Sequence, residues 1–257
     1  MIKAVFFDFD DTLVSRKTHE MIESTRKAVE LLHSKNILPV MATGRPMYTI
    51  KKYIDDLKIE NGVFLNGHVS WANREVILDK KLGSEKIKHM FDIAEKYDFP
   101  YAVVSNEDTY LSCDVSNIGD VMVINGQYKA QKLQKTSDIN GNLLWLFAKE
   151  AFDEKITSSA AEKGMRSLRW GEEGVDIISG DVSKKTGVKV LLDKLGIDFS
   201  EIMFFGDGDN DIELMEAAKI GVAMGNGTEN LKKVSDYITD DIENDGIYNA
   251  LVKLEII

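Results

Sequence analysis

The chain has 257 residues, which is enough for one large domain or two modest ones. Its composition, with 44% hydrophobic and 29% charged residues, is typical of a globular protein and argues against extensive disorder. The net charge of -11 repels nucleic-acid phosphates and anionic membrane surfaces, so we expect neither as a partner, and any phosphate-binding site must be locally cationic.

The N-terminal sequence MIKAVFFDFDDT has an apolar stretch of only a few residues before its carboxylates, which is too short for a signal peptide or a membrane anchor. Cys113 is the only cysteine and cannot form an internal disulfide. Both observations predict a protein of the reducing cytoplasm.

The first third of the chain alternates between strand and helix. Apolar runs short enough for buried strands are separated by helical spacings of apolar residues, and Pro46 suits the first turn of a helix. We expect, in order, strand, helix, strand, helix and strand at residues 2–8, 28–32, 37–42, 46–57 and 63–65. This order predicts a parallel sheet with helices on both faces.

The segment 82–181 has a different order of predicted elements. A helical pattern at residues 87–94 precedes apolar runs typical of strands, at 101–105, 143–148, 165–170 and 175–179. We interpret this segment as a separate α+β unit, inserted into a domain made of residues 1–81 and 182–257.

Strand and helix alternate again after Ser183. The pattern predicts a helix at 188–195, a strand at 202–205 that ends in GDGDND, a further helix, a short strand at 221–224 and a closing helix. Together with the first third of the chain, it predicts an α/β fold with a Rossmann-like, doubly wound parallel sheet.

Four polar signals follow the predicted strands directly. They are DFDDT from Asp8, TGR from Thr43, Asn66-Gly67, and GDGDND from Gly206. One acidic turn after a strand means little, because aspartates commonly build turns and cap helices. Four signals at the end of a parallel sheet where ligands bind predict a functional site.

The residue types in these signals suit phosphoryl transfer. Asp8 and Asp10 would lie on the same side of an extended chain, because Phe9 points the opposite way. One carboxylate can then attack phosphorus while the other handles protons. Asp207 and Asp211 would bring the number of carboxylates to four, which would repel one another without a cation. A hard divalent ion resolves that repulsion, and Mg²⁺ is the usual choice beside phosphate.

The ordered set DFDDT, TGR, a lysine in VSKKTGVKVL, and GDGDNDI followed by GVAMGNG resembles the motifs of the haloacid dehalogenase superfamily. The spacing is similar to that of its Cof-type sugar-phosphatase branch, whose members carry a large α/β cap between the second and third motifs. The likeness covers the N-terminal segment and everything after about Val182, and the middle matches by size and position. It implies that residues 82–181 are a cap that sets substrate specificity.

The resemblance also implies a role for each residue that matches a motif. Asp8 would be the nucleophile, and Asp10 would be the general acid for the leaving alcohol and then the base for water. The Asp8 carboxylate, the Asp10 backbone carbonyl and Asp207 would hold Mg²⁺, with Asp211 binding it directly or through water.

The phosphate-binding residues that the resemblance implies are Phe9, Thr43, Gly44, Lys184 and Asn210. Lys184 is preferred to Lys185 because the family's lysine is followed by glycine at the place that Lys185 occupies.

A few other positions have less definite interpretations. Arg45 and Asn66 are candidates for contact with the substrate, although an arginine that starts a helix can equally pair with a nearby carboxylate. Asp11 is interpreted as a turn or capping residue. Asn226-Gly227 stands where the family usually has Asn-Ala, and we interpret the glycine as local backbone freedom without catalytic meaning.

The implied function is that of a Mg²⁺-dependent phosphatase for small phosphorylated metabolites. Asp10 supports hydrolysis or phosphoryl transfer, because the family's transport ATPases have threonine there and its dehalogenases lack this aspartate. A phosphomutase would use the same nucleophile but release no phosphate in step with substrate loss. A non-catalytic phosphate-responsive module would need neither Asp10 nor the inserted unit. The sequence alone names neither the metabolite nor the oligomeric state.

Overall fold

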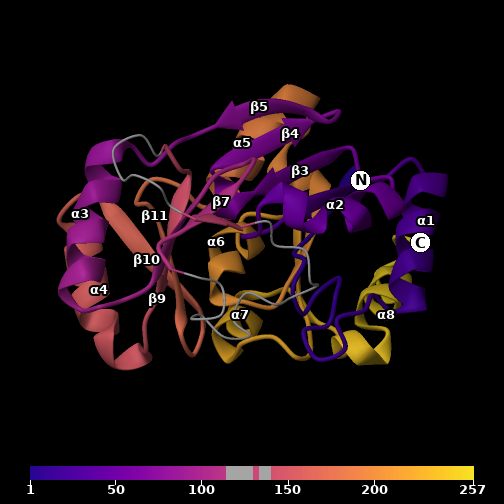
Figure 1. Cartoon of the computed structure of the whole chain (residues 1–257). Coiled ribbons are helices and arrows are strands. Elements are labelled where there is room, and N and C mark those ends of the chain that lie inside the picture. The colour runs from indigo at the N-terminus through magenta and orange to yellow at the C-terminus, as the bar shows by residue number, and fades with distance from the viewer. Residues whose placement is uncertain (114–129, 133–139) are drawn as a thin grey trace. The chain divides into compact units, whose positions relative to one another are not determined.

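The computed structural model describes residues 1–113, 130–132 and 140–257 (Figure 1). The chain divides into two units, which are described separately below. The core unit consists of Met1–Arg45, Ile50–Leu78 and Ser183–Ile257, and the inserted unit consists of Pro46–Thr49 and Asp79–Val182. Within the described residues, every helix is too short or too polar to cross a membrane.

The core unit contains an eight-stranded sheet. Six strands run parallel, and β4 then pairs antiparallel with β3. The strands lie in the order β14 (Tyr237–Ile238), β13 (Ile220–Ala223), β12 (Ile202–Gly206), β1 (Ala4–Phe7), β2 (Leu38–Ala42), β3 (Asn61–Phe64), β4 (Val69–Ala72) and β5 (Glu75–Asp79).

Helices cover this sheet because its central strands are apolar on both faces. All four residues of β1 are buried, and alternate side chains point to opposite faces. On one face Ala4 and Phe6 share a hydrophobic core with residues of three helices, α5 (Lys184–Leu195), α6 (Ile212–Met215) and α7 (Glu229–Val234). Elsewhere α1 (Glu23–Ser34) contacts β2 and α8 (Gly246–Lys253), which lies next to it in Figure 1. The core unit also contains the helix α2 (Met47–Asp56) from Ile50 onwards.

The inserted unit contains a six-stranded, mostly antiparallel sheet with two helices packed on it. Side chains from both helices, α3 (Ser84–Lys96) and α4 (Asp153–Ala161), share a hydrophobic core with alternate residues of the central strands. The strands lie in the order β10 (Met165–Gly171), β11 (Gly174–Ser179), β9 (Leu143–Phe147), β6 (Tyr101–Val104), β7 (Thr109–Leu111) and β8 (Ala130–Lys132).

The predicted fold class is confirmed, and so are the long apolar strands and the predicted helices. Sequence reasoning misses the weaker elements, namely β4, β5, β7, β8, β14, α4 and α7. The helix α4 is missed because only Ile156 and Ala160 of its nine residues are buried, which leaves little periodicity to detect. The strand β4 also pairs antiparallel with β3, which the expectation of a parallel sheet did not include.

Candidate active site

Two neighbouring parallel strands bring Asp8 and Asp207 to the same edge of the core sheet. Phe7 of β1 pairs with Phe205 of β12, and the next N–H, that of Asp8, donates to the Phe205 carbonyl at 2.9 Å. Asp8 directly follows β1, and Asp207 directly follows β12. Ligands of open α/β sheets bind at this edge, beyond the carboxyl ends of the strands.

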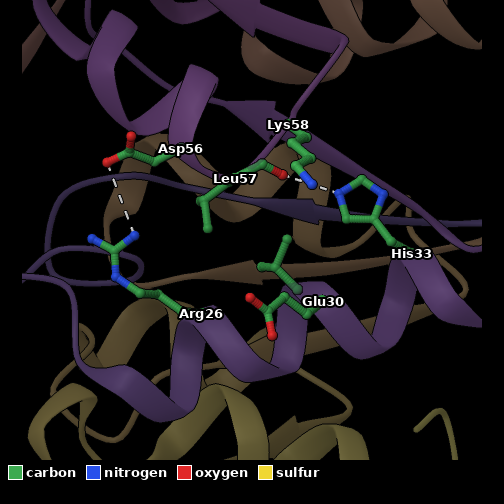
Figure 2. Close-up of a pocket in the computed structure, with 7 residues that line it drawn as sticks. Arg26, Glu30, His33, Asp56, Leu57 and Lys58 are labelled. Atoms are coloured by element: carbon green, nitrogen blue, oxygen red, sulfur yellow. Dashed lines mark hydrogen bonds and ion pairs between the residues drawn. The ribbon is translucent and has the colours of Figure 1, made fainter.

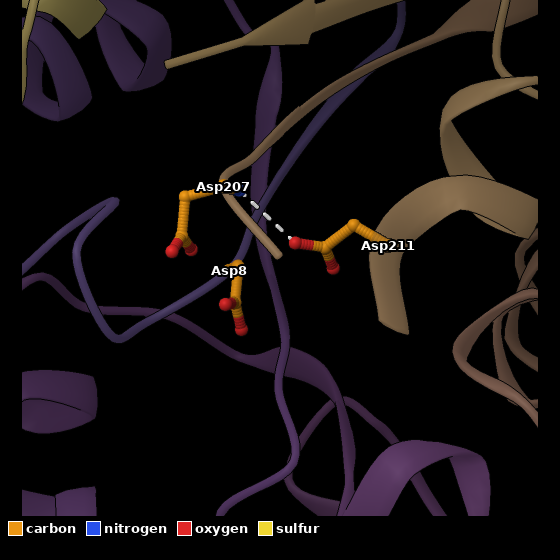
Figure 3. A group of neighbouring side chains, drawn as sticks. All are labelled: Asp8, Asp207 and Asp211. Atoms are coloured by element: carbon orange, nitrogen blue, oxygen red, sulfur yellow. Dashed lines mark hydrogen bonds between the residues drawn. The ribbon is translucent and has the colours of Figure 1, made fainter. Parts of the chain in front are cut away.

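Three carboxylates gather at this edge (Figure 3). Asp8, Asp207 and Asp211 each offer an oxygen, and these atoms lie within 4.8 Å of one another. Asp211 is held in place because its Oδ2 accepts hydrogen bonds from the N–H groups of Asp207 and Gly208, both at 3.1 Å. Among the described residues, the group therefore contains three of the four predicted aspartates, without the Asp10 carboxylate.

The surroundings of these carboxylates favour a bound cation. Burial raises the pKa of Asp207 well above its usual value, and the charges of Asp8 and Asp211 raise it further. Burial also raises the pKa of Asp211, to about 6, although the charge of Lys184 opposes the increase. Carboxylate oxygens are the ligands that Mg²⁺ prefers, so this set of donors fits a hard divalent cation.

Lys184 lies between two members of the group. Its Nζ is 2.8 Å from Asp8 Oδ1 and 2.6 Å from Asp211 Oδ1, and its side chain is 1% exposed. Burial opposes the charged form, but the two carboxylates outweigh burial and raise the pKa of Lys184, so the ammonium group stays charged. Lys185 is exposed. The structure therefore places Lys184, and not its neighbour, beside the predicted nucleophile.

The start of α5 approaches the turn after β3 very closely, and this approach brings Lys184 to the strand ends. Ser183 caps the helix by accepting a hydrogen bond from the Thr186 N–H. Gly67 has a φ of 102°, and a Cβ at this position would lie 1.9 Å from the Ser183 carbonyl oxygen. Glycine is required there for both the backbone conformation and the close contact.

Replacing Lys184 should destabilise the protein strongly at neutral pH. Lys184→Met leaves the carboxylates of Asp8 and Asp211 buried without their cation, and removing one partner of a buried ion pair typically costs about 3–5 kcal/mol. The free energy of unfolding can be measured by urea denaturation without added metal. Lys185→Met is the matched control and should stay within about 0.5 kcal/mol of the wild type. Equal stability of the two variants would contradict the proposed balance of charges.

Arg45 binds both carboxylate oxygens of Asp10 through two nitrogens of its guanidinium group. Nε donates to Asp10 Oδ2 at 2.7 Å, and Nη2 donates to Oδ1 at 2.6 Å. Burial raises the pKa of Asp10, but the charge and hydrogen bonds of Arg45 more than compensate and lower it below its usual value. The sequence leaves two interpretations of Arg45 open, contact with the substrate and pairing with a nearby carboxylate. The structure shows the pairing, with Asp10.

Phe9 separates the two catalytic candidates and anchors them in the core. Its fully buried ring contacts the edge of Tyr53 at a centroid distance of 5.1 Å, and Arg45 Cζ lies 5.2 Å from the ring centroid. The Phe9 carbonyl accepts hydrogen bonds from the N–H groups of Leu13 and Val14. A contact between Phe9 and phosphate would therefore come from its backbone N–H.

The other predicted phosphate-binding residues lie around Asn66. Its N–H donates to the Thr43 carbonyl at 3.1 Å, and its Oδ1 accepts from Asn210 Nδ2 at 3.1 Å. A Cβ added to Gly44 would lie 3.1 Å from the Asn66 side chain. Asn66, predicted as a possible substrate contact, thus bridges the two predicted phosphate-binding segments.

Sequence reasoning misses two residues of this region. Thr12 Oγ1 donates to Asp207 Oδ1 at 3.2 Å, and Arg16 Nε lies 3.8 Å from Asp10 Oδ1. Thr12 belongs to the DFDDT motif and could have been found there, whereas Arg16 carries no signal in the sequence. The interpretation of Asp11 as a turn residue is confirmed, because its φ is 51° and its Oδ1 accepts from the Arg16 N–H at 2.8 Å.

The interpretation of Gly227 as local backbone freedom is wrong. Gly227 is absent from the residues with positive φ in the described chain, so its backbone does not require glycine. A Cβ at this position would lie 2.9 Å from the Met224 carbonyl oxygen and 3.1 Å from that of Asp207. The restriction is therefore one of space, beside the backbone of a predicted metal ligand.

A surface pocket of about 280 Å³ lies elsewhere on the core unit, between α1 and the residues after α2 (Figure 2). Three of its polar side chains contact nearby groups. Arg26 Nη1 lies 4.0 Å from Asp56 Oδ2, and the His33 ring Nε2–H donates to the Leu57 carbonyl at 3.0 Å. None of the predicted site residues lines this pocket.

Comparison with protein families and curated proteins gives consistent results. The model of the haloacid dehalogenase-like hydrolase family matches residues 5–251. The 5-amino-6-(5-phospho-D-ribitylamino)uracil phosphatase YcsE of Bacillus subtilis is 25% identical over 97% of this chain and 94% of its own. A Streptococcus pyogenes protein, named as a bifunctional phosphatase and peptidyl-prolyl cis-trans isomerase, is 31% identical over the whole of this chain, which spans 54% of that protein.

Solved structures show the same similarity over the full length. The HAD subclass IIB sugar phosphatase BT4131 has a TM-score of 0.90 and 29% identity, over 99% of this chain and all of its own. The HAD superfamily phosphatase BT1666 of Bacteroides thetaiotaomicron has a TM-score of 0.88 and 29% identity, over the whole of this chain and 96% of its own.

Proposed function

This chain belongs to the haloacid dehalogenase-like hydrolases and is a phosphoric monoester hydrolase, and we propose that it acts through an aspartyl-phosphate formed on Asp8. The observation that carries the proposal is the position of the Asp8 carboxylate, beside a buried lysine and two further carboxylates suited to a cation. The positive charges of the lysine and of a bound cation would allow the dianionic phosphate to approach an anionic nucleophile.

In the first proposed step, an Asp8 carboxylate oxygen attacks phosphorus and the ester P–O bond breaks. Asp10 donates a proton to the departing alkoxide, which leaves as the alcohol. Lys184 would neutralise charge on the phosphoryl oxygens, as it does for Asp8 in this structure. Besides the nucleophile, the protein contributes positioning and charge stabilisation, which phosphoryl transfer depends on strongly.

In the second step, water attacks the aspartyl-phosphate and gives its proton to Asp10. The bond between phosphorus and the Asp8 oxygen breaks, which releases inorganic phosphate and restores the carboxylate. The pairing with Arg45 keeps Asp10 ionised in this structure, which suits a base. To act first as an acid, Asp10 must gain a proton, and the arrival of an anionic phosphate nearby would raise its pKa towards that form.

Mg²⁺ is the proposed cofactor, held by Asp8, Asp207 and the Asp10 backbone carbonyl, with Asp211 binding it directly or through water. When bound, the ion would reduce the negative charge on the phosphoryl group and on the nucleophile. The proposed phosphate contacts are Thr43, Gly44, Asn210 and the Phe9 N–H. These groups lie close to the carboxyl ends of the strands that carry the site, β1, β2 and β12.

The proposed substrates are phosphate esters of small polyhydroxylated metabolites, hydrolysed in the cytoplasm. The names of two similar proteins support this class, since one is a sugar phosphatase and the other acts on a phosphorylated ribityl compound. A panel of phosphorylated metabolites, assayed with Mg²⁺ and ranked by kcat/KM, tests the proposal. Release of inorganic phosphate in step with substrate loss is expected, whereas isomerisation without release would identify a phosphomutase.

Asp10→Asn should affect different esters to different extents. General acid catalysis typically contributes about 10²–10⁴-fold, and it matters most for alkoxide leaving groups that need a proton. We therefore expect kcat/KM to fall by about a hundredfold or more for an alkyl phosphate, and much less for an aryl phosphate.

Asp11→Asn is the matched control for this variant, because it changes the neighbouring carboxylate and keeps the Oδ1 atom that accepts from the Arg16 N–H. Its kcat/KM should stay close to that of the wild type on both esters. Equal losses on the two esters in Asp10→Asn would show that Asp10 does not transfer the proton.

A further inference from the structure

The side chain of Asn226, in the loop after β13, holds two distant segments of backbone. Its Nδ2 donates to the Asp11 carbonyl at 2.8 Å, and its Oδ1 accepts from the Ile242 N–H at 2.8 Å. Asn226 is exposed, so water could satisfy its amide group instead. That both ends bind backbone groups indicates that this amide fixes the position of the segments it joins.

One of these segments is the turn that carries Asp10. Asp11 has a left-handed φ of 51°, and its N–H donates to the Val14 carbonyl at 2.8 Å. The hydrogen bond from Asn226 therefore fixes the carbonyl of a residue whose backbone is already restricted, directly after Asp10. This carbonyl belongs to the peptide that joins Asp11 to Thr12, so a shift of that peptide would reach Asp10 through the restricted backbone of Asp11.

The same loop also contacts the segment that carries Asp207. The Thr228 N–H donates to the Asp207 carbonyl at 2.8 Å. The backbone of Gly227 lies so close to the same carbonyl that a side chain at position 227 would have no space. Residues 226–228 thus contact the backbone at Asp207 and, through Asn226, the backbone at Asp11. The loop sets the position of one segment relative to the other.

We propose that Asn226 is a positioning residue for the reaction, which keeps the Asp10 carboxyl in register with Asp8 and Asp207 by holding the Asp11 carbonyl. This inference rests on the proposed function, in which Asp10 transfers the proton. The hydrogen bonds from the Asn226 side chain to Asp11 and Ile242 both go to backbone groups, so Asn226 would act through the backbone of the turn.

The role predicts an effect on proton transfer in particular. Proton transfer requires the donor and acceptor heavy atoms to lie about 2.6–3.2 Å apart, so a small displacement of Asp10 is costly. A displacement of about 1 Å can cost roughly a hundredfold in rate. The loss should be larger for esters whose leaving group needs a proton, whereas a loss of folded protein lowers activity on all esters equally.

The test compares two variants of Asn226 with a matched control, on an alkyl phosphate and an aryl phosphate. Asn226→Asp keeps an acceptor for the Ile242 N–H and loses the donor to Asp11, whereas Asn226→Ala loses both. Asn249→Ala is the control, because this exposed asparagine also donates two hydrogen bonds, to Asp240 and Asn244 and not to the turn that carries Asp10.

We expect the ratio of kcat/KM for the alkyl ester to that for the aryl ester to fall by roughly tenfold in both Asn226 variants. In Asn249→Ala the ratio should remain that of the wild type. The added charge in Asn226→Asp would weaken binding of both phosphates alike, so it would not change the ratio.

An unchanged ratio in the Asn226 variants would overturn the inference, even if their activity or melting temperature falls. Asp10→Asn, measured in parallel, separates this result from a failure of the proposed function. If Asp10→Asn lowers the ratio and the Asn226 variants do not, only the positioning role is wrong. If Asp10→Asn itself leaves the ratio unchanged, the proton-transfer role of Asp10 is wrong, and the inference fails with it.

Discussion

Asp8→Asn should remove essentially all turnover while leaving the protein folded. The substitution is nearly isosteric but replaces the charged nucleophile with a neutral amide, which cannot form the acyl phosphate. Since phosphate monoesters hydrolyse extremely slowly without an enzyme, little residual activity should remain. The measurements are kcat on the best substrate of the panel and the melting temperature of the purified variant.

Asp209→Asn is the matched control, because Asp209 belongs to the GDGDND motif but lies outside the group of three carboxylates and is exposed. It should keep most of its activity. Mass spectrometry of the wild-type enzyme, quenched in acid during turnover, should detect a phosphoryl adduct on the peptide that contains Asp8. We expect Asp8→Asn to lose several orders of magnitude in turnover. Turnover above a few per cent of the wild type would show that another residue is the nucleophile.

Removal of divalent metal should abolish activity almost as completely. Asp8, Asp207 and Asp211 carry more negative charge than Lys184 can balance, so a phosphate dianion should bind very poorly without a cation. We expect EDTA to lower kcat/KM by at least about a hundredfold, and Mg²⁺ to restore it, because the ion supplies several kcal/mol of charge stabilisation. EDTA already saturated with Mg²⁺ should have no effect, and full activity in excess free EDTA would contradict the metal site.

The affinity for Mg²⁺ should also depend on pH. The pKa of Asp211 is raised to about 6 and that of Asp207 is raised as well, so both carboxyls bind protons more tightly in the metal-free protein than isolated carboxyls do. A metal ion requires the deprotonated forms and competes with these protons. The Mg²⁺ concentration for half-maximal activity should therefore rise as the pH falls through about 6.

The sequence predicts the centre of this fold better than its edges. The strands that carry the site, β1, β2 and β12, are apolar on both faces and end in polar motifs, so their identity and their ends are clear from the residues alone. The hairpin of β3 and β4 is missed because Asn66-Gly67 is interpreted as a site signal and because β4 has only four residues.

Within the site, sequence reasoning identifies the residue types but not their partners. It finds Arg45 and Asn66 by their place at strand ends, but which side chain each contacts depends on loops that lie far apart in the sequence. Asn226 shows the same limit. Its hydrogen bond to Asp11 spans 215 residues, and no local pattern of the chain indicates it.

The pairing of β1 with β12 also affects when the enzyme can become active during its synthesis. Asp8 is made before the inserted unit, but its neighbouring strand β12 and Lys184 are made after the whole of that unit. Contacts between such distant residues form slowly, because a long loop must close first. Until the ribosome has released β12, one edge of β1 lacks its partner strand, and an unpaired apolar edge is prone to aggregation. Because β2 pairs with the opposite edge of β1, we expect the nascent chain to depend on a chaperone to protect this edge of the strand that ends at the nucleophile.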